Sequence, residues 1–246
     1  MLSITSKQNV KIKNANKLKR KKVRDAEGKV LLEGVHLIVE AFQNQIEIEQ
    51  LFVVREDLIH EDIIHKAQEV YEINLDIAEA LSDTVTPQGV FAVIQKPTYE
   101  VADKNRVLLV DRVQDPGNLG TMIRTADAAG YDLIVISRGT VDPYQDKVLR
   151  ASQGSVFHIP IVNEDLLTFI QDFDGPVYGT ALEDAVPYKD VEISERFCLI
   201  LGNEGEGVSK DLLKETTQNL TVPIYGRAES LNVSIAAGIL MYHLRG

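Results

Sequence analysis

Short apolar runs alternating with helical segments are the feature that most constrains the fold of this chain. Residues 107–110 (VLLV), 133–136 (LIVI) and 198–201 (CLIL) are apolar at every position. Residues 176–180 and 220–222 are two further strand candidates. Uniformly apolar strands are buried on both faces, and intervening helices connect such strands in parallel. The sequence therefore predicts an α/β domain with a mainly parallel sheet that helices cover on both sides.

A smaller α/β pattern precedes it. We expect strands at 30–33, 48–54, 73–75 and 90–94, and helices at 35–44, 61–70 and 77–81. The segment that follows is polar and begins with Pro97, which is typical of a linker. The predicted organisation is an N-terminal domain over residues 1–96, a linker over 97–105 and a C-terminal domain over 106–246.

Charge is distributed very unevenly. The net charge is −11, yet residues 1–24 hold nine Lys and Arg and no acidic residue. Removing those nine from the 26 basic residues leaves 17, against 37 acidic residues. Cations gathered in one arm attract phosphate groups, because salt screens more distant charges beyond a Debye length of about 10 Å. The alternative is a solvated, partly disordered tail. The predicted nucleic-acid contacts are Lys11, Lys17, Lys19, Arg20, Lys21, Lys22 and Arg24.

Composition disfavours several classes of protein. The single cysteine, Cys198, sits in an apolar run, so we expect a core residue in a reducing compartment. No apolar stretch approaches the ~18 residues of a membrane span, and the N-terminus is charged where a signal peptide is apolar. We therefore expect a cytoplasmic protein that does not associate with a membrane. His60 and His65 lie about 140° apart on a helix, which does not suit zinc, and we expect no metal.

Three separated segments place small and polar residues after predicted strands. They are residues 118–124 (NLGTMIR), 201–209 (LGNEGEGVS) and 222–234 (VPIYGRAESLNVS). Ligands of α/β sheets usually bind where strands give way to loops. The sequence therefore predicts a ligand site to which all three segments contribute.

Local structure alone also explains part of this pattern. Asn118 can cap the helix that follows the turn at 115–117, and Arg124 can point to solvent. Ser230 can cap the last helix, whereas Asn232 is harder to explain because asparagine is a poor helix former. That helix, residues 230–244, has an apolar face, which we expect to be packed. The face comprises Leu231, Ile235, Ile239 and Tyr242.

The glycine-rich segment 202–207 differs from a phosphate loop. It lacks a lysine, and Glu204 and Glu206 would repel a phosphate group. A ligand with a purine, a ribose and a positive centre suits it better, and S-adenosylmethionine is such a ligand. A turn that simply precedes the helix at 208–215 is the structural alternative.

In this order and spacing, the three segments resemble the motifs of the SpoU (TrmH) branch of the SPOUT RNA methyltransferases. The resemblance implies transfer of a methyl group from S-adenosylmethionine to a ribose 2′-hydroxyl of ribosomal or transfer RNA. It also implies a C-terminal domain with a trefoil knot, a homodimer, and chemistry without a metal. Residues 1–96 look like the substrate-binding domain that precedes many such enzymes, which favours ribosomal RNA.

The resemblance assigns roles to individual residues. Arg124 would be catalytic, Asn118 and Glu204 would shape the site, and Ser230 and Asn232 would position the target nucleotide. Because a guanidinium keeps its proton, we expect Arg124 to stabilise the developing alkoxide electrostatically. The residues that would hold the cofactor through their backbones are Leu201, Gly202, Val222, Ile224 and Leu231.

Other functions compete with this one. A transfer-RNA 2′-O-methyltransferase uses the same motifs, and a non-catalytic RNA-binding protein can retain the fold. Other SPOUT branches methylate bases. A nicotinamide enzyme is disfavoured, because no Gly-x-Gly-x-x-Gly follows an early strand.

Overall fold

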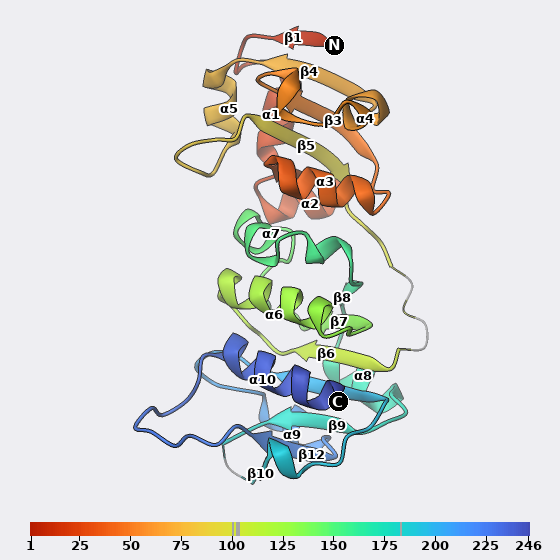
Figure 1. Ribbon diagram of the computed structural model, residues 1–246, viewed down its shortest axis with the longest axis vertical. Helices are drawn as coiled ribbons and strands as arrows, with labels where there is room; N and C mark the ends of the chain where they lie inside the picture. Colours follow the sequence, from red (N-terminus) through yellow and green to blue (C-terminus); the bar gives the residue numbers. More distant parts are fainter. Residues whose placement is uncertain (100, 102–103, 183) are drawn as a thin grey trace. The chain divides into compact units, whose positions relative to one another are not determined.

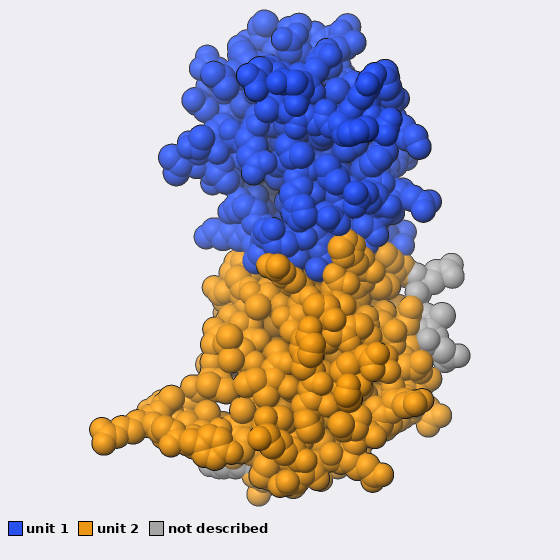
Figure 2. Space-filling view, in the orientation of Figure 1, with its two compact units in different colours: residues 1–98, 144–157 blue, residues 99–143, 158–246 orange. Residues whose placement is uncertain are grey.

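Two sheets organise the chain. The computed structural model describes residues 1–99, 101, 104–182 and 184–246. Residues 1–98 and 144–157 form unit 1, and residues 99–143 and 158–246 form unit 2 (Figure 2). Three positions of the predicted linker, 100, 102 and 103, lie outside the described residues. Residues 144–157, which chain order assigns to the C-terminal domain, group with unit 1 because α7 (Asp146–Ser152) packs on β2 (Lys29–Glu33).

Unit 1 is built on a five-stranded sheet with the order β1-β4-β3-β5-β2 (Figure 1). β5 pairs antiparallel with β2 and β3, and the other pairs are parallel. The remaining strands are β1 (Leu2–Ile4), β3 (Ile48–Val53), β4 (Glu69–Ile73) and β5 (Val90–Gln95). The helices besides α7 are α1 (Val10–Lys17), α2 (Lys21–Glu27), α3 (Val35–Gln43), α4 (Glu61–Lys66) and α5 (Leu75–Leu81).

The basic arm is part of this fold, so the alternative of a disordered tail is wrong. β1 pairs with β4, while Ile12, Ala15 and Leu18 are buried in one core with residues of α5 and of the sheet. The apolar positions of the arm are spaced so that α1 covers the sheet with one face and exposes its lysines on the other. Burial of these side chains holds the arm in place.

The predicted helix 61–70 and strand 73–75 are wrong in their bounds. The helix ends at Lys66, and Ala67 is already extended at φ −66° and ψ 138°. Residues Glu69–Ile73 then pair with β1 on one side and with β3 on the other. This pairing with distant segments decides the boundary, and the local pattern does not reveal it.

Unit 2 contains a seven-stranded sheet in the order β10-β12-β9-β11-β6-β7-β8, and all of its strand pairs are parallel. The predicted parallel sheet is thus confirmed. Its strands are β6 (Arg106–Val110), β7 (Leu133–Ile136), β8 (Ile161–Asn163), β9 (Val177–Thr180), β10 (Val186–Pro187), β11 (Phe197–Leu201) and β12 (Gln218–Thr221). Its helices are α6 (Pro116–Ala128), α8 (Leu166–Asp172), α9 (Lys210–Lys214) and α10 (Val233–Arg245).

Helices cover both faces of this sheet. α8 and α9 share a core with residues of β6, β7, β9 and β11, and Cys198 lies in that core as predicted. α6 and α10 pack against each other, and α10 also meets β11. None of the helices in the described ranges is long and apolar enough to cross a membrane.

The predicted apolar face of the last helix is not its packed face within the chain. Ile235 and Tyr242 are more than half exposed, at 55% and 57%. α10 buries another set of residues, because that side of the helix meets α6 and β11. The buried set is Ser234, Ala237, Leu240, Met241 and Leu244.

Candidate functional site

The three motif segments lie at one edge of the unit 2 sheet. They follow β6, β11 and β12, and the carboxyl ends of parallel strands meet at the same edge. β6 and β11 are direct neighbours in the sheet, and the strand order reverses between them, because β7 and β8 lie beyond β6 on the other side. A reversal of this kind opens a crevice, which is where parallel sheets bind ligands.

A chain of hydrogen bonds joins the three segments. The Glu204 carboxylate accepts from the Asn118 amide at 3.1 Å. The Asn118 carbonyl Oδ1 in turn accepts from Nδ2 of Asn232 at 2.9 Å. Glu204 also accepts from the backbone N–H groups of Gln114 at 3.1 Å and Asp115 at 2.9 Å. The structure thus brings together one predicted site residue from each motif.

The ionisation of Glu204 orients both amides. Burial raises the pKa of Glu204, but the hydrogen bonds from Asp115, Asn118 and Gln114 outweigh it and leave the pKa below its ordinary value. An ionised carboxylate only accepts hydrogen bonds, so Asn118 must turn its NH₂ group toward Glu204. The carbonyl of Asn118 then faces Asn232, so Asn232 must donate through its NH₂ group. Its own Oδ1 stays available for other partners.

Two predicted helix caps are corrected. The N-cap of α6 is Asp115, whose carboxylate accepts from the Asn118 N–H at 2.8 Å. The N-cap of α10 is Asn232, and its Oδ1 accepts from Ser234 N at 2.8 Å and Ile235 N at 3.4 Å. Ser230 lies before the cap, is exposed, and its side chain makes no hydrogen bond within the described part of the chain. Asn232 therefore has two functions, as cap and as partner of Asn118.

Arg124 lies apart from this trio in the single chain. It is exposed on α6, six residues after Asn118, which places it about 120° around the helix. Its guanidinium has no partner among the described residues. An arginine without an ion pair on the helix that carries Asn118 is free to meet another molecule.

Four of the predicted cofactor residues lie at or just after the ends of β11 and β12, and Leu231 directly precedes the cap of α10. Leu201 and Gly202 are buried, Val222 and Ile224 are half-buried, and Leu231 is 37% exposed. Within the described chain, the backbone of residues 223–231 makes no hydrogen bond. Its N–H and C=O groups are open to a ligand with many polar atoms, and this donor set fits S-adenosylmethionine. No group of three or more His, Cys, Asp or Glu that suits a metal occurs among residues 1–99, 101, 104–182 and 184–246.

Thr180 at the end of β9 was not among the predicted site residues. β9 lies between β11 and β12, so its carboxyl end opens into the middle of the same edge. Thr180 Oγ1 donates to the Ile200 carbonyl at 3.1 Å, and Ala181 N donates to the Leu220 carbonyl at 3.1 Å. The segment after this strand contains no glycine and matches none of the three motifs, so only the strand order reveals its place.

The predicted nucleic-acid contacts fall into three groups. Arg24 is 4% exposed and donates to the carbonyl oxygens of Leu18 and Lys19, both at 2.8 Å, so we remove it from the set. Lys11, Lys19 and Lys21 each form an ion pair, with Glu69, Asp83 and Asp25. The exposed residues without an ion pair in the described chain are Lys17, Arg20 and Lys22.

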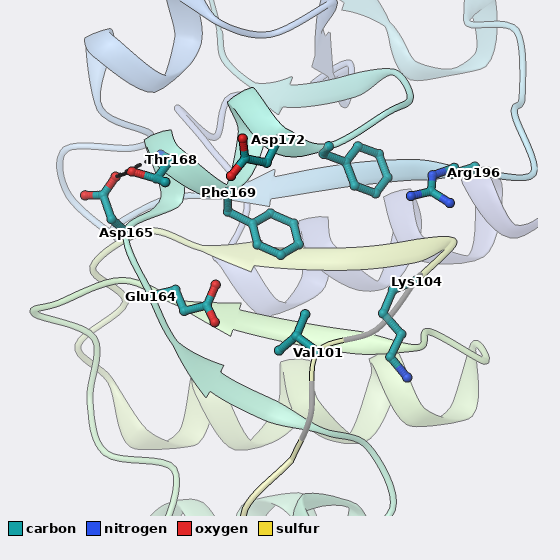
Figure 3. Close-up of a pocket in the computed structure, with 9 residues that line it drawn as sticks. Val101, Lys104, Glu164, Asp165, Thr168, Phe169, Asp172 and Arg196 are labelled. Carbon is teal, nitrogen blue, oxygen red and sulfur yellow. Dashed lines mark hydrogen bonds between the residues drawn. The ribbon is translucent and has the colours of Figure 1, made fainter.

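A pocket of about 590 Å³ lies elsewhere in unit 2, beside α8 (Figure 3). The rings of Phe169 and Phe173 stack there with their centroids 6.2 Å apart, and the Arg196 guanidinium lies 5.0 Å from the Phe173 ring. None of the predicted site residues lines this pocket. The motif crevice, and not this pocket, is the candidate site.

Comparison with known families agrees with the geometry. The model of the SpoU rRNA methylase family matches residues 105–242, and that of the MRM3-like substrate binding domain matches residues 9–92. The chain belongs to the SpoU rRNA methylase family. The resemblance seen in the three motifs is thus confirmed, and the fold is that of a SpoU methylase domain preceded by a substrate-binding domain.

Individual relatives support the same family. The 23S rRNA (guanosine(2553)-2′-O)-methyltransferase RlmP of Bacillus subtilis is 47% identical over 249 residues, covering 100% of both chains. The structure of an AdoMet-bound rRNA methyltransferase from Sinorhizobium meliloti is 31% identical, with a TM-score of 0.89 over 99% of this chain and 97% of that one. The mouse mitochondrial rRNA methyltransferase 3 is 27% identical over 92% of this chain and 69% of its own length.

The double function of Asn232 in this SpoU protein can be separated. Asn232→Asp keeps an oxygen that caps α10 but removes the donor to Asn118, whereas Asn232→Ala removes both. A hydrogen bond contributes ~0.5–1.5 kcal/mol, so the aspartate variant should lose roughly threefold to tenfold in methyl transfer with little change in melting temperature. The alanine variant should also lose ~0.5–2 kcal/mol of stability. Wild-type activity of Asn232→Asp would show that the link to Asn118 is unimportant.

Proposed function

We propose that this protein transfers a methyl group from S-adenosylmethionine to a ribose 2′-hydroxyl of ribosomal RNA. The observation that carries the proposal is the hydrogen-bonded trio Asn118, Glu204 and Asn232 at the carboxyl edge of the sheet. The family supports the reaction, and the substrate-binding match over residues 9–92 supports RNA as the substrate. We also propose a cytoplasmic location, because the relative that matches the whole chain is the 23S rRNA methyltransferase of a bacterium.

Each residue of the site has a distinct part in this proposal. The backbones of Gly202, Val222 and Leu231 hold S-adenosylmethionine, whose sulfonium supplies an activated methyl group. Asn118 and Glu204 hold the loops of motifs 1 and 2 together, so the crevice is organised before substrate arrives. Arg124 stabilises the ribose oxygen as it gains negative charge, and it stays protonated while doing so. Ser230 and Asn232 position the target nucleotide.

The target we propose is the guanosine of 23S rRNA that corresponds to the one named for RlmP. That relative matches the whole chain at 47% identity, including the substrate-binding region. Transfer RNA is the alternative substrate.

One experiment separates these possibilities. Purified protein is incubated with methyl-labelled S-adenosylmethionine and a 23S rRNA fragment containing that guanosine, and the digested nucleosides are identified by mass. We expect 2′-O-methylguanosine, and no product when the guanosine carries a 2′-deoxyribose. Methylation of the deoxy substrate would indicate a base methyltransferase. Methylation of tRNA alone would identify transfer RNA as the substrate. An absence of cofactor binding would indicate a non-catalytic RNA-binding protein.

We further propose that the exposed cations of the N-terminal arm contact RNA phosphates. Lys17, Arg20 and Lys22 are exposed and form no ion pair with any described residue. Replacing all three by glutamine should weaken RNA binding. The slope of log affinity against log salt should fall by about 0.7–0.9 for each lost phosphate contact. Titrations at several salt concentrations measure this slope.

A charge-matched variant controls for net charge. Lys66, Lys189 and Lys210 lie outside the arm, and their replacement by glutamine changes the net charge by the same amount. We expect this control to retain the wild-type slope. Equal slopes for both triple variants would assign the attraction to overall charge instead of to the arm.

A homodimer is part of the proposal. The outward side of α10 exposes Ile235 and Tyr242, and Tyr225 in the loop before it is 92% exposed. Ile235 and Tyr242 share one face of α10, and an exposed apolar helix face fits a second copy of the chain. Sedimentation equilibrium tests this directly, since a species of twice the monomer mass is expected and a monomer at micromolar concentration contradicts it.

A further inference from the structure

Arg112, the second residue after β6, joins the ends of three neighbouring strands through its backbone. Its φ is 57°, in the left-handed region that non-glycine residues rarely adopt. Its N–H donates to Ser137 Oγ after β7 at 2.9 Å. Its carbonyl accepts from Asn203 Nδ2 after β11, also at 2.9 Å. This strained backbone is therefore held from both sides.

The side chain of Arg112 spans from the buried end of β6 to the motif 2 loop. Nε and Nη2 donate to the two carboxylate oxygens of Asp111 at 3.0 and 3.2 Å, and Nη1 donates to Glu206 Oε2 at 2.6 Å. Asp111 is only 3% exposed, and it also accepts from Ser209 N at 2.9 Å. Hydrogen bonds that the guanidinium donates to Asp111 and Glu206 raise the pKa of Arg112, so the cation persists. Asp111 and Arg112 together hold the C-terminal end of the motif 2 loop in place, through Ser209 and Glu206.

The loop itself is internally braced. Asn203 and Gly207 exchange two backbone hydrogen bonds at 3.1 and 2.9 Å. Asn203 Oδ1 also accepts from Gly205 N at 2.9 Å and Glu206 N at 3.1 Å. A braced loop moves as one piece, so its base determines where Glu204 at its tip lies.

We infer that Arg112 is a positioning residue for methyl transfer. It sets the orientation of residues 202–207, and through them the contact of Glu204 with Asn118 and the place of Gly202 beside the cofactor. In the described structure, Arg112 itself makes no hydrogen bond or ion pair with the motif residues Asn118, Arg124 and Asn232. The inference rests on the proposed function, because its test measures the binding of S-adenosylmethionine.

The test uses Arg112→Lys, because a lysine keeps the charge but cannot bond to Asp111 and Glu206 in the same fork. Full removal of the arginine would leave the buried Asp111 carboxylate unpaired and destabilise the fold. Calorimetry should show S-adenosylmethionine binding weakened roughly tenfold, as the loss of charge-assisted hydrogen bonds predicts. KM for the cofactor should rise more than kcat falls, and RNA affinity should stay unchanged.

A double-mutant cycle with Glu206→Gln shows whether Arg112 acts through the loop. Glu206→Gln alone should weaken cofactor binding only about twofold to threefold, since that carboxylate is largely exposed. In its presence, Arg112→Lys should have a smaller effect than in the wild type. Arg55→Lys, which alters an exposed ion pair with Asp57 in unit 1, is the control and should change nothing.

The outcomes are distinct. Cofactor affinity of Arg112→Lys within twofold of wild type, or strictly additive effects in the cycle, would overturn the inference while leaving the proposed function intact. Failure of the wild-type protein to bind S-adenosylmethionine would overturn the proposed function, and this inference with it.

Discussion

Replacing Arg124 by alanine is expected to lower methyl transfer by ~10²–10³ and to leave the affinity for S-adenosylmethionine nearly unchanged. The guanidinium is exposed and has no partner in the described parts of the chain, so its loss removes no contact that holds the fold. The proposal assigns it to the ribose oxygen and not to the cofactor. Single-turnover rates with saturating RNA and calorimetric cofactor binding measure the two quantities separately.

Arg138→Ala is the matched control for this prediction. Arg138 is also exposed in unit 2, follows β7, and has no side-chain partner among the described residues. If both arginines act only by attracting RNA, each variant should have a higher KM for RNA, and its methyl-transfer rate should return to the wild-type value at saturating RNA. A rate for Arg124→Ala within a few-fold of wild type at saturating RNA would show that Arg124 is a solvated helix residue.

Replacing Gly202 by alanine is expected to disrupt the motif 2 loop. A Cβ atom at this position would lie 2.1 Å from the backbone C of Gly207 and 2.1 Å from the backbone N of Val208. Neither atom can rotate away, so the loop must shift and carry Glu204 with it. Overpacking typically costs ~1–3 kcal/mol, which corresponds to a loss of roughly one to two orders of magnitude in cofactor affinity.

Gly205→Ala, three residues further along the same loop, is the control. The nearest atom to a Cβ there is Asn203 Oδ1 at 3.6 Å, an ordinary contact. This variant should bind cofactor like the wild type and melt at a similar temperature. Equal losses in the two variants would mean that any added methyl group disturbs the loop, and the close approach at Gly202 would not be the cause.

The site illustrates how far local sequence reasoning extends. It identified Asn118, Glu204 and Asn232 by their motifs, and the structure shows that they contact one another. Their separations of 86 and 114 residues mean that the contacts depend on the strand order. The caps were assigned to Asn118, three residues after the actual cap Asp115, and to Ser230, two residues before the actual cap Asn232. Several polar residues near a helix start satisfy the same rule, and only the backbone geometry selects among them.

The sequence alone determined the classes of structure and chemistry. Uniformly apolar strands between helices can be buried only in a parallel sheet covered on both faces, and that requirement is local to each segment. The motifs likewise identified the methylase family through residue types and spacing. The trefoil knot that the resemblance implies stays a prediction.

The tertiary structure decided which residues meet. It showed that the basic arm is folded, that Arg24 is buried, and that α10 packs on α6 with a side the apolar pattern did not indicate. It also revealed that Arg112, to which no sequence motif pointed, bonds to its neighbour Asp111 and to Glu206, 94 residues further along the chain. Contacts of this range arise from strand order and loop closure, and these depend on the free energy of the whole fold instead of on any single segment.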